Sequence, residues 1–153
     1  MDLSKILQEN RIVIDVQSIS KREVIAELVN TAIASGIEMD MDDTVNSFME
    51  RETLGSTGIG LGVAIPHIRI ESIDHCLVVF GKSNGGVEYA AIDNKPVHLF
   101  FMIFGPLHEE RQENYLKLMA AISKALRQSD VRDSLVAMDS SNQVLEFFAN
   151  RAD

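Results

Sequence analysis

The feature that most constrains the fold is a nearly uninterrupted apolar run, Val97-His98-Leu99-Phe100-Phe101-Met102-Ile103-Phe104. A strand with one face in solvent alternates apolar and polar residues, whereas a strand covered on both faces is apolar throughout. The run is too short to span a bilayer as a helix, which takes about 20 residues. We therefore predict that Val97–Phe104 is the central strand of a covered sheet and that Gly105-Pro106 ends it.

Helix and strand patterns alternate along the rest of the chain, which favours an α/β domain. Strands are expected at Arg11–Val16, Gly62–Ile65 and Cys76–Phe80, with a turn at Asn84-Gly85-Gly86. Helices are expected at Leu3–Gln8, Val24–Ile33, Met41–Thr53 and Glu109–Leu126, from Ser129 or Asp130 to Ala137, and from Ser140 onward. The prediction is a single α/β domain over residues 1–153, with a mixed sheet of the five-stranded type flanked by helices on both sides.

One predicted helix carries signals at both of its ends. In Ser20-Lys21-Arg22-Glu23, Ser20 is the expected N-cap and Glu23 is expected to reach back to it, forming a capping box. Gly36 can adopt the left-handed conformation that commonly ends a helix. Together these residues predict where the helix containing Val24–Ile33 starts and stops.

Composition limits the classes of partner. The formal net charge is −9 and the pI is near 4.8, which argues against nucleic acid and anionic membranes as main partners. The single cysteine, Cys76, excludes an internal disulfide and agrees with a reducing, cytoplasmic setting. Met1–Lys5 lacks the basic and apolar regions of a signal peptide, so we expect no membrane insertion.

The segment Arg51–His67 is more specific than generic patterning. Its glycine-rich part, Gly55–Gly62, can turn tightly and can bring its backbone close to a ligand. Exposed amides in such a loop can bind an anion, and Ser56 and Thr57 add hydroxyl donors. The segment therefore predicts a site for a negatively charged group.

Two side chains at the ends of this segment supply the chemistry. Arg51 is a planar cation suited to phosphate. His67 follows a short predicted strand, and a neutral imidazole can act as a nucleophile near neutral pH and form a covalent intermediate. His67 is therefore the candidate acceptor and Arg51 the candidate stabilising charge.

Several familiar site patterns are missing from the sequence. There is no Gly-x-x-x-x-Gly-Lys-Ser/Thr phosphate loop, and Gly58-x-Gly60 lacks the third glycine of a dinucleotide fingerprint. His108-Glu109-Glu110 is not a zinc motif, because Gln112 stands where a second histidine is needed. The histidines show no metal-ligand spacing, so the residues predict neither a metal ion nor a cofactor.

At this point a family resemblance can be stated. Leu54–Gly60 followed by Ala64-Ile65-Pro66-His67 resembles the active-site signature of the fructose–mannitol type of enzyme IIA domains. These domains belong to the bacterial phosphoenolpyruvate-dependent sugar phosphotransferase system, and the match is closest to its nitrogen-regulatory branch. Ala91–Leu99 is similar to the family's approach to its central strand, and the order of elements agrees over nearly the whole chain.

The resemblance implies that His67 takes a phosphoryl group from a phosphohistidine on a small carrier protein of the HPr or NPr kind, with Arg51 helping to hold it. Further residues are expected to bind at the site: Ser56, Thr57, Gly58, Gly60 and Tyr115. Because the sequence contains no sugar-transporting domain, we expect a regulatory protein with an unidentified target protein, rather than part of a permease. A weak homo-oligomer stays open.

Tyr115 departs from the family pattern, which usually has a histidine at this position in a His-Leu-x-Leu-Leu-Ala run. A tyrosine hydroxyl can donate a hydrogen bond but supplies no imidazolium charge at neutral pH. The alternative function is therefore a regulatory binding module with weak or no phosphotransfer. Tyr115 as a core residue, Ser56 and Thr57 as loop caps, and His108 folding back toward the site also stay open.

Overall fold

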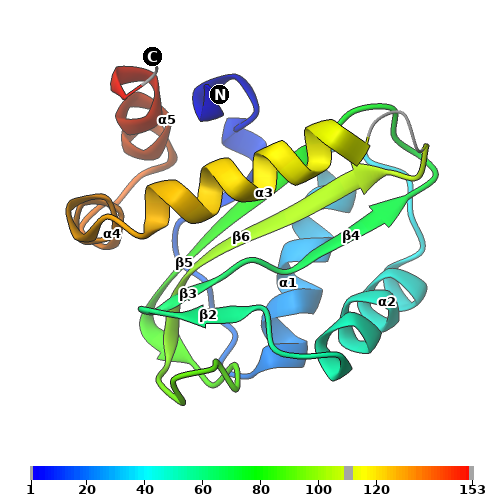
Figure 1. Ribbon diagram of the computed structural model, residues 1–153, viewed down its shortest axis with the longest axis horizontal. Helices are drawn as coiled ribbons and strands as arrows, with labels where there is room; N and C mark the ends of the chain where they lie inside the picture. Colours follow the sequence, from blue (N-terminus) through cyan, green and yellow to red (C-terminus); the bar gives the residue numbers. More distant parts are fainter. Residues whose placement is uncertain (1, 109–111, 152–153) are drawn as a thin grey trace.

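The computed structural model describes residues 2–108 and 112–151. Within these ranges one mixed, six-stranded sheet lies between two layers of helices (Figure 1). The strand order is β1-β5-β6-β3-β2, and β4 also pairs with β6. The predicted α/β class, with helices on both sides of the sheet, is confirmed.

The elements have the following bounds. The strands are β1 (Ile12–Val13), β2 (Gly58–Gly60), β3 (Val63–Ala64), β4 (His67–Ile70), β5 (Leu77–Val87) and β6 (Val97–Pro106). The helices are α1 (Lys21–Ala34), α2 (Met41–Thr53), α3 (Gln112–Leu126), α4 (Ser129–Val136) and α5 (Ser141–Asn150), with short 3-10 turns η1 (Leu3–Lys5) and η2 (Glu9–Arg11). No helix in the described part of the chain has both the length and the apolar character needed to cross a bilayer.

Strand β6 is the predicted central strand, and its side chains explain why it is apolar throughout. Phe100, Met102 and Phe104 enter the core shared with α1 and α2. Leu99, Phe101 and Ile103 enter the core on the other face, beneath α3, α4 and α5. Successive residues of a strand point to opposite faces, so two buried faces require an apolar residue at almost every position.

Strands β3 and β4 share one edge of β6. Ala64 pairs with Phe100 and His67 pairs with Ile103, so the two short strands lie in line. Ile65 and Pro66 separate them, and the carbonyl of Pro66 accepts the amide of Ile103 at 2.9 Å. In the described residues the sheet is thus five positions wide although it contains six strands, because β3 and β4 occupy one position.

Three sequence predictions about strands are corrected. Strand β5 does not end at Phe80; it continues to Val87 through the predicted turn, with a register shift between Lys82 and Val87. The glycine-rich segment is not entirely loop, because Gly58–Gly60 forms β2. Gly105-Pro106 does not stop β6, because both residues pair with β4.

Several predicted boundaries near the start of the chain are also too long. The strand expected at Arg11–Val16 is reduced to Ile12–Val13, and the helix expected at Leu3–Gln8 is the 3-10 turn Leu3–Lys5. At the other end of the sheet, α3 begins at Gln112 within the described ranges, while Glu109 and Glu110 lie outside the described residues.

The predicted helix caps are partly confirmed. Ser20 is the N-cap of α1, but its hydroxyl donates to Glu23 at 2.6 Å, so the expected capping box does not form. Gly36, with φ +107°, follows the end of α1 as predicted. The N-cap of α4 is Gln128, one residue before the expected Ser129 or Asp130, whereas Ser140 forms a complete capping box on α5.

Candidate functional site

His67 is the first residue of β4, directly after the break that separates β3 from β4. Its Nδ1 atom lies 2.7 Å from the carbonyl oxygen of Ile65. A carbonyl oxygen only accepts hydrogen bonds, so Nδ1 carries the proton of the neutral ring. Nε2 then holds the free lone pair and is the ring nitrogen that can attack an electrophile.

Burial lowers the pKa of His67 below its ordinary value of 6.5, and the nearby Arg51 guanidinium lowers it further. The hydrogen bond to Ile65 and the carboxylate of Glu52 raise the pKa without reversing the shift. A histidine whose pKa lies below 6.5 is mainly neutral at pH 7. The nucleophilic form of His67 is therefore its main form at neutral pH.

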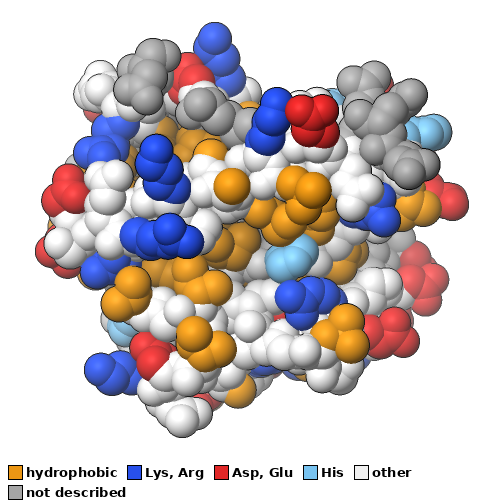
Figure 2. Space-filling view, viewed as in Figure 1, with side chains coloured by type: hydrophobic (Ala, Val, Ile, Leu, Met, Phe, Trp, Pro, Cys, Tyr) orange, Lys and Arg blue, Asp and Glu red, His pale blue; other side chains and the backbone are white. Residues whose placement is uncertain are grey.

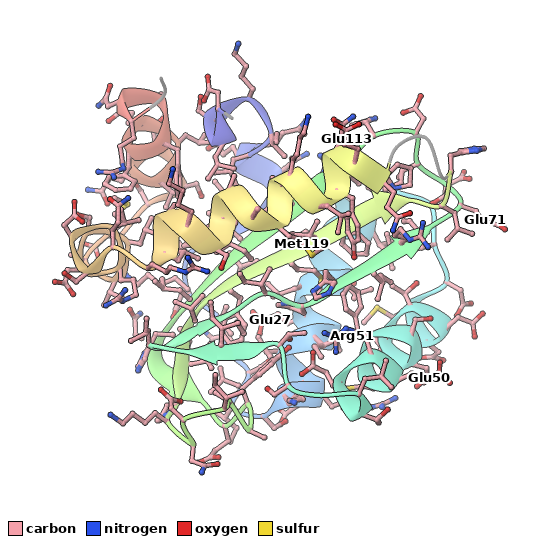
Figure 3. All side chains as sticks on the ribbon, in the orientation of Figure 1. Glu27, Glu50, Arg51, Glu71, Glu113 and Met119 are labelled. Carbon is pink, nitrogen blue, oxygen red and sulfur yellow. The ribbon has the colours of Figure 1, made fainter. Side chains whose placement is uncertain are left out.

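His67 lines a pocket of about 220 Å³ at the edge of the sheet. The other lining residues come from α2, the following loop, the sheet and α3: Arg51, Ser56, Thr57, Ile59, Ile65, Met119 and Ser123. Figure 3 shows Arg51 at the end of α2 and Met119 on α3, on either side of this edge. On the same face, Figure 2 shows a histidine bordered by hydrophobic side chains and a basic side chain.

Arg51 stands in the last turn of α2 and is half-buried. Its Nη1 atom donates to the carbonyl oxygen of Gly55 at 3.0 Å, which holds the guanidinium beside the loop. A guanidinium has five N–H donors in a fixed plane, so further donors are available to an anion in the pocket. The structure thus brings the predicted cation and the predicted acceptor, His67, into one pocket.

Thr57 directs its hydroxyl into the protein, which corrects the expectation that this group is a donor to a ligand. The hydroxyl donates to Glu52 at 2.5 Å and its oxygen lies 3.0 Å from the Tyr89 hydroxyl. Glu52 is 8% exposed, and it also accepts the Thr57 amide at 3.1 Å and Lys21 Nζ at 2.8 Å. This network fixes the loop between α2 and β2, which carries one wall of the pocket.

Gly58 and Gly60 shape the loop but do not line the pocket. A Cβ atom at Gly58 would lie 2.7 Å from Cβ of Ala91, so only glycine allows this approach. Gly60 has φ +91°, a conformation that favours glycine. Ser56 lines the pocket, but its Oγ accepts the Gly58 amide at 3.0 Å.

The anion site expected from the loop amides is also corrected. Three of these amides donate to acceptors within the protein, namely those of Thr57, Gly58 and Leu61. In the described residues, the groups best placed to meet an anion are therefore side chains, with Arg51 first among them.

Tyr115 lies beside His67, with the two ring centroids 6.1 Å apart. Its ring is 6% exposed and packs against Gly105 on β6. Burial raises the pKa of Tyr115 to about 12, although the charge of Arg69 opposes the shift. Tyr115 is thus both a core residue and a neighbour of the site, and it is uncharged at neutral pH.

Sequence reasoning missed Arg69, a second cation close to this group. Arg69 lies on β4 two residues after His67, so both side chains are on the same face of the strand. Its charge acts on the Tyr115 hydroxyl. A period of two starting at His67 was the available signal, but it has meaning only once β4 is recognised as a strand.

The remaining histidines lie away from the pocket. His108 is exposed and lines a separate pocket with Glu71 and Leu107, so it does not fold back toward His67. His98 has its Nδ1 atom 2.8 Å from the carbonyl of Ser83. His98 therefore has the same hydrogen-bond pattern as His67 without the adjacent Arg51.

The chain was compared with known proteins. It is 33% identical to a nitrogen regulatory protein of Pseudomonas aeruginosa over 87% of this chain and 85% of the relative. It is 31% identical to a fructose-specific EIIA component of Haloferax volcanii, over 97% of this chain and 95% of the relative. It is 30% identical over 95% of its length to a fructose-specific EIIABC component of Bacillus subtilis, but spans only 23% of that protein.

Structural similarity agrees with these matches. The crystal structure of the nitrogen regulatory protein IIA-Ntr from Neisseria meningitidis superposes with a TM-score of 0.86 at 28% identity, covering 95% of this chain and 98% of that one. A family model described as the phosphoenolpyruvate-dependent sugar phosphotransferase system, EIIA 2, matches residues 5–151. The chain therefore belongs to this EIIA family, as the sequence motif around His67 predicted.

Proposed function

We propose that this protein is a phosphocarrier that accepts a phosphoryl group on Nε2 of His67. The proposal rests mainly on one observation: the hydrogen bond from Nδ1 to the Ile65 carbonyl leaves Nε2 unprotonated in a pocket that also contains Arg51. The donor would be a phosphohistidine on an HPr- or NPr-like carrier. A bond forms between Nε2 and phosphorus while the bond from phosphorus to the donor imidazole breaks.

Charge stabilisation supports this assignment. A phosphoryl group brings about 1.5 to 2 negative charges at neutral pH, and the Arg51 guanidinium can meet two of its oxygens at once. Transfer between two imidazoles needs mainly alignment and stabilisation of charge. The described residues of the pocket provide both through fixed groups, because Gly55 holds Arg51 and Ile65 holds His67.

We further propose a regulatory role in the cytoplasm, with the phosphorylation state of His67 read by a target protein. The similarity to nitrogen regulatory proteins supports this choice over a role within a sugar permease. The single cysteine agrees with a reducing compartment.

Transfer of label from phosphoenolpyruvate tests the phosphocarrier role. The protein is incubated with labelled phosphoenolpyruvate, enzyme I and an HPr or NPr carrier, and acid-labile phosphate is measured. We expect label on the wild type and none on His67→Ala. His98→Ala is the matched control, since His98 has the same hydrogen-bond pattern outside the pocket. Label that survives His67→Ala would show that another residue is the acceptor.

Arg51→Gln tests the role of the cation in the same assay. We expect the rate to fall about 100-fold, the size of effect seen when a charge-stabilising donor is removed. An unchanged rate would remove Arg51 from the site.

Tyr115 favours the alternative function, a regulatory binding module with weak or no phosphotransfer. It is uncharged at neutral pH, and it stands where the family pattern has a histidine. The same assay distinguishes the two functions, because a binding module would take up no label while a control EIIA protein in the mixture is labelled. If Tyr115→His then gains label, the substitution itself accounts for the missing transfer.

A further inference from the structure

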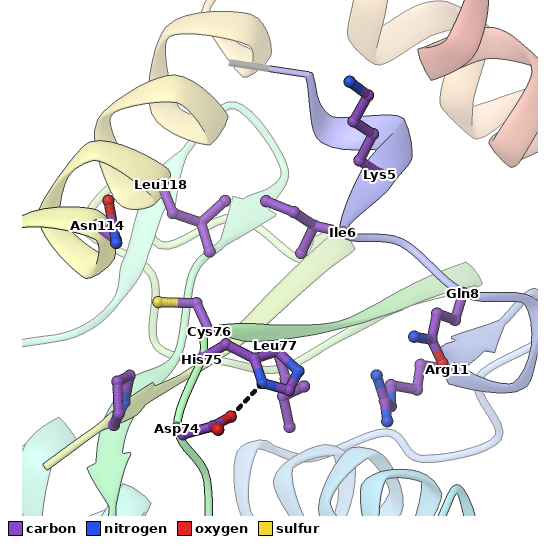
Figure 4. Close-up of a pocket in the computed structure, with 11 residues that line it drawn as sticks. Lys5, Ile6, Gln8, Arg11, Asp74, His75, Cys76, Leu77, Asn114 and Leu118 are labelled. Atoms are coloured by element: carbon purple, nitrogen blue, oxygen red, sulfur yellow. Dashed lines mark hydrogen bonds and ion pairs between the residues drawn. The ribbon is translucent and has the colours of Figure 1, made fainter. Parts of the chain in front are cut away.

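A larger pocket, of about 330 Å³, lies away from His67 and has no part in the proposed phosphotransfer. Its walls come from η1, η2, the start of β5, the end of β6 and α3 (Figure 4). A volume of 330 Å³ is at the lower end of the range of small-molecule sites, which runs from about 300 to 1,000 Å³. The pocket is therefore large enough for a small organic molecule but not for a nucleotide cofactor.

Arg11 is the residue that indicates what this pocket takes. Only 7% of its surface is exposed, yet no carboxylate among the described residues forms an ion pair with it. Its Nε atom donates to Ser35 Oγ at 2.8 Å, and the end of its guanidinium is directed into the pocket (Figure 4). A buried charge without a counter-ion is costly, and an anion in the pocket would remove that cost.

The environment of Arg11 supplies partial compensation only. Ser35 caps the carboxyl end of α1, which carries a partial negative charge. Burial still lowers the pKa of Arg11, which means that its charged form is disfavoured where it lies. An anionic ligand would meet the Nη atoms, which donate to no protein acceptor in the described residues.

The rest of the lining fits a molecule with an apolar body. Hydrophobic side chains cover the inner wall: Ile6, Cys76, Leu77, Pro106 and Leu118. Lys5 adds a second cation at the mouth, and Asp74 is held by His75 at 2.7 Å and is mostly exposed. The pocket thus combines two basic groups and one carboxylate with an apolar interior, in a protein whose net charge is −9.

We propose that this pocket is a binding site for a small organic anion, in which Arg11 binds a carboxylate or phosphate head and the hydrophobic wall covers an apolar body. Nothing in the proposed phosphotransfer requires such a ligand. The site is nevertheless connected to the His67 pocket through α3, because Asn114 and Leu118 line one pocket and Met119 and Ser123 line the other.

A matched set of probes tests the proposal on the wild-type protein by amide chemical-shift titration. Hexanoate and hexyl phosphate carry the two possible heads on the same body, 1-hexanol lacks the charge, and acetate and inorganic phosphate lack the body. We expect at least one of the two six-carbon anions to shift the amides of Cys76, Leu77 and Leu118. We expect 1-hexanol and the two small anions to bind about 10-fold to 100-fold more weakly, as for loss of a charged hydrogen bond or of apolar burial.

Variants assign the charge and exclude the other pocket. Arg11→Gln is expected to weaken the six-carbon anion at least tenfold, while Lys95→Gln, at an exposed lysine elsewhere, should change nothing. Arg51→Gln should also leave binding unchanged, which separates this site from the His67 pocket. If Arg11→Gln does not fold, the comparison of hexanoate with 1-hexanol still decides.

Three results would overturn the proposal. These are no binding of either six-carbon anion at 10 mM, on the order of ordinary metabolite concentrations or above, equal binding of 1-hexanol, and shifts confined to residues around Arg51 and His67. None of them depends on phosphotransfer, so failure here leaves the phosphocarrier assay unaffected, and the reverse also holds.

Discussion

Gly105 provides a sharp test of the packing behind the site. A Cβ atom added there would lie 2.4 Å from Cδ1 and 2.8 Å from Cγ of Tyr115. Carbon atoms in contact are normally about 3.5–4.0 Å apart, so Gly105→Ala requires a shift of more than about 1 Å. Tyr115 is 6% exposed, and Gly105 lies in β6, where it pairs with Arg69 of β4. Neither side can move freely.

The expected cost follows from this overlap. Forcing extra atoms into a packed core costs about 1–3 kcal/mol, and we expect the upper half of that range because the partner is a buried ring. Gly85→Ala is the matched control, because an added Cβ at Gly85 meets nothing within 4 Å. A glycine-to-alanine change at a compatible position is neutral or stabilising by up to about 1 kcal/mol. The two variants should therefore differ by roughly 2–4 kcal/mol.

Urea unfolding of both variants measures this difference directly, since a change in midpoint at constant slope is a change in stability. A second comparison isolates the contact: in a Tyr115→Ala background, Gly105→Ala should lose most of its cost, because the clashing ring atoms are absent. The His67 ring resonances should shift in Gly105→Ala alone. If Gly105→Ala is as stable as Gly85→Ala, the packing of Tyr115 on β6 is wrong.

Three further predictions concern the site. Thr57→Val should cost about 2–3 kcal/mol in urea unfolding, because it removes a buried hydrogen bond to the carboxylate of Glu52; Ser56→Ala, whose hydroxyl serves one loop amide, should cost less than about 1 kcal/mol, and equal costs would contradict the network. Tyr115→Phe should change stability by less than about 0.5 kcal/mol, because no described residue bonds the hydroxyl. His67 should make folding less stable as pH falls below its unfolded pKa of about 6.5, because its folded pKa is lower and the unfolded chain binds the proton first; His67→Asn should lack this component of the pH profile.

The central part of the fold could be predicted from sequence because its pattern is local. The run Val97–Phe104 is apolar on both faces, and both faces are buried. Strand β4 could not be predicted in the same way, because His67–Ile70 follows a proline and is held by pairing with β6, far along the chain. For the same reason β5 continues through a glycine-rich segment that looks like a turn when read alone.

The site shows the same division between local and tertiary information. Arg51 and His67 were predicted from the motif, and the structure places them in one pocket. The orientation of Thr57 was not predictable, because it depends on the burial of Glu52 against Lys21 of another helix. A hydroxyl and a carboxylate five residues apart do not reveal from sequence whether they face each other or a ligand.

Tyr115 gives the site a consequence for pH dependence. Its pKa of about 12 means that it gains no charge at any pH at which the protein works, and Arg51 loses none. His67 is then the single group of the described pocket that titrates near neutral pH, and its pKa is lowered. The rate of phosphoryl acceptance should therefore fall along one acidic limb with a midpoint below 6.5. A histidine at position 115 would add a second group that titrates in this range. Tyr115→His should broaden that limb or split it in two, and an unchanged profile would show that position 115 has no electrostatic influence on His67.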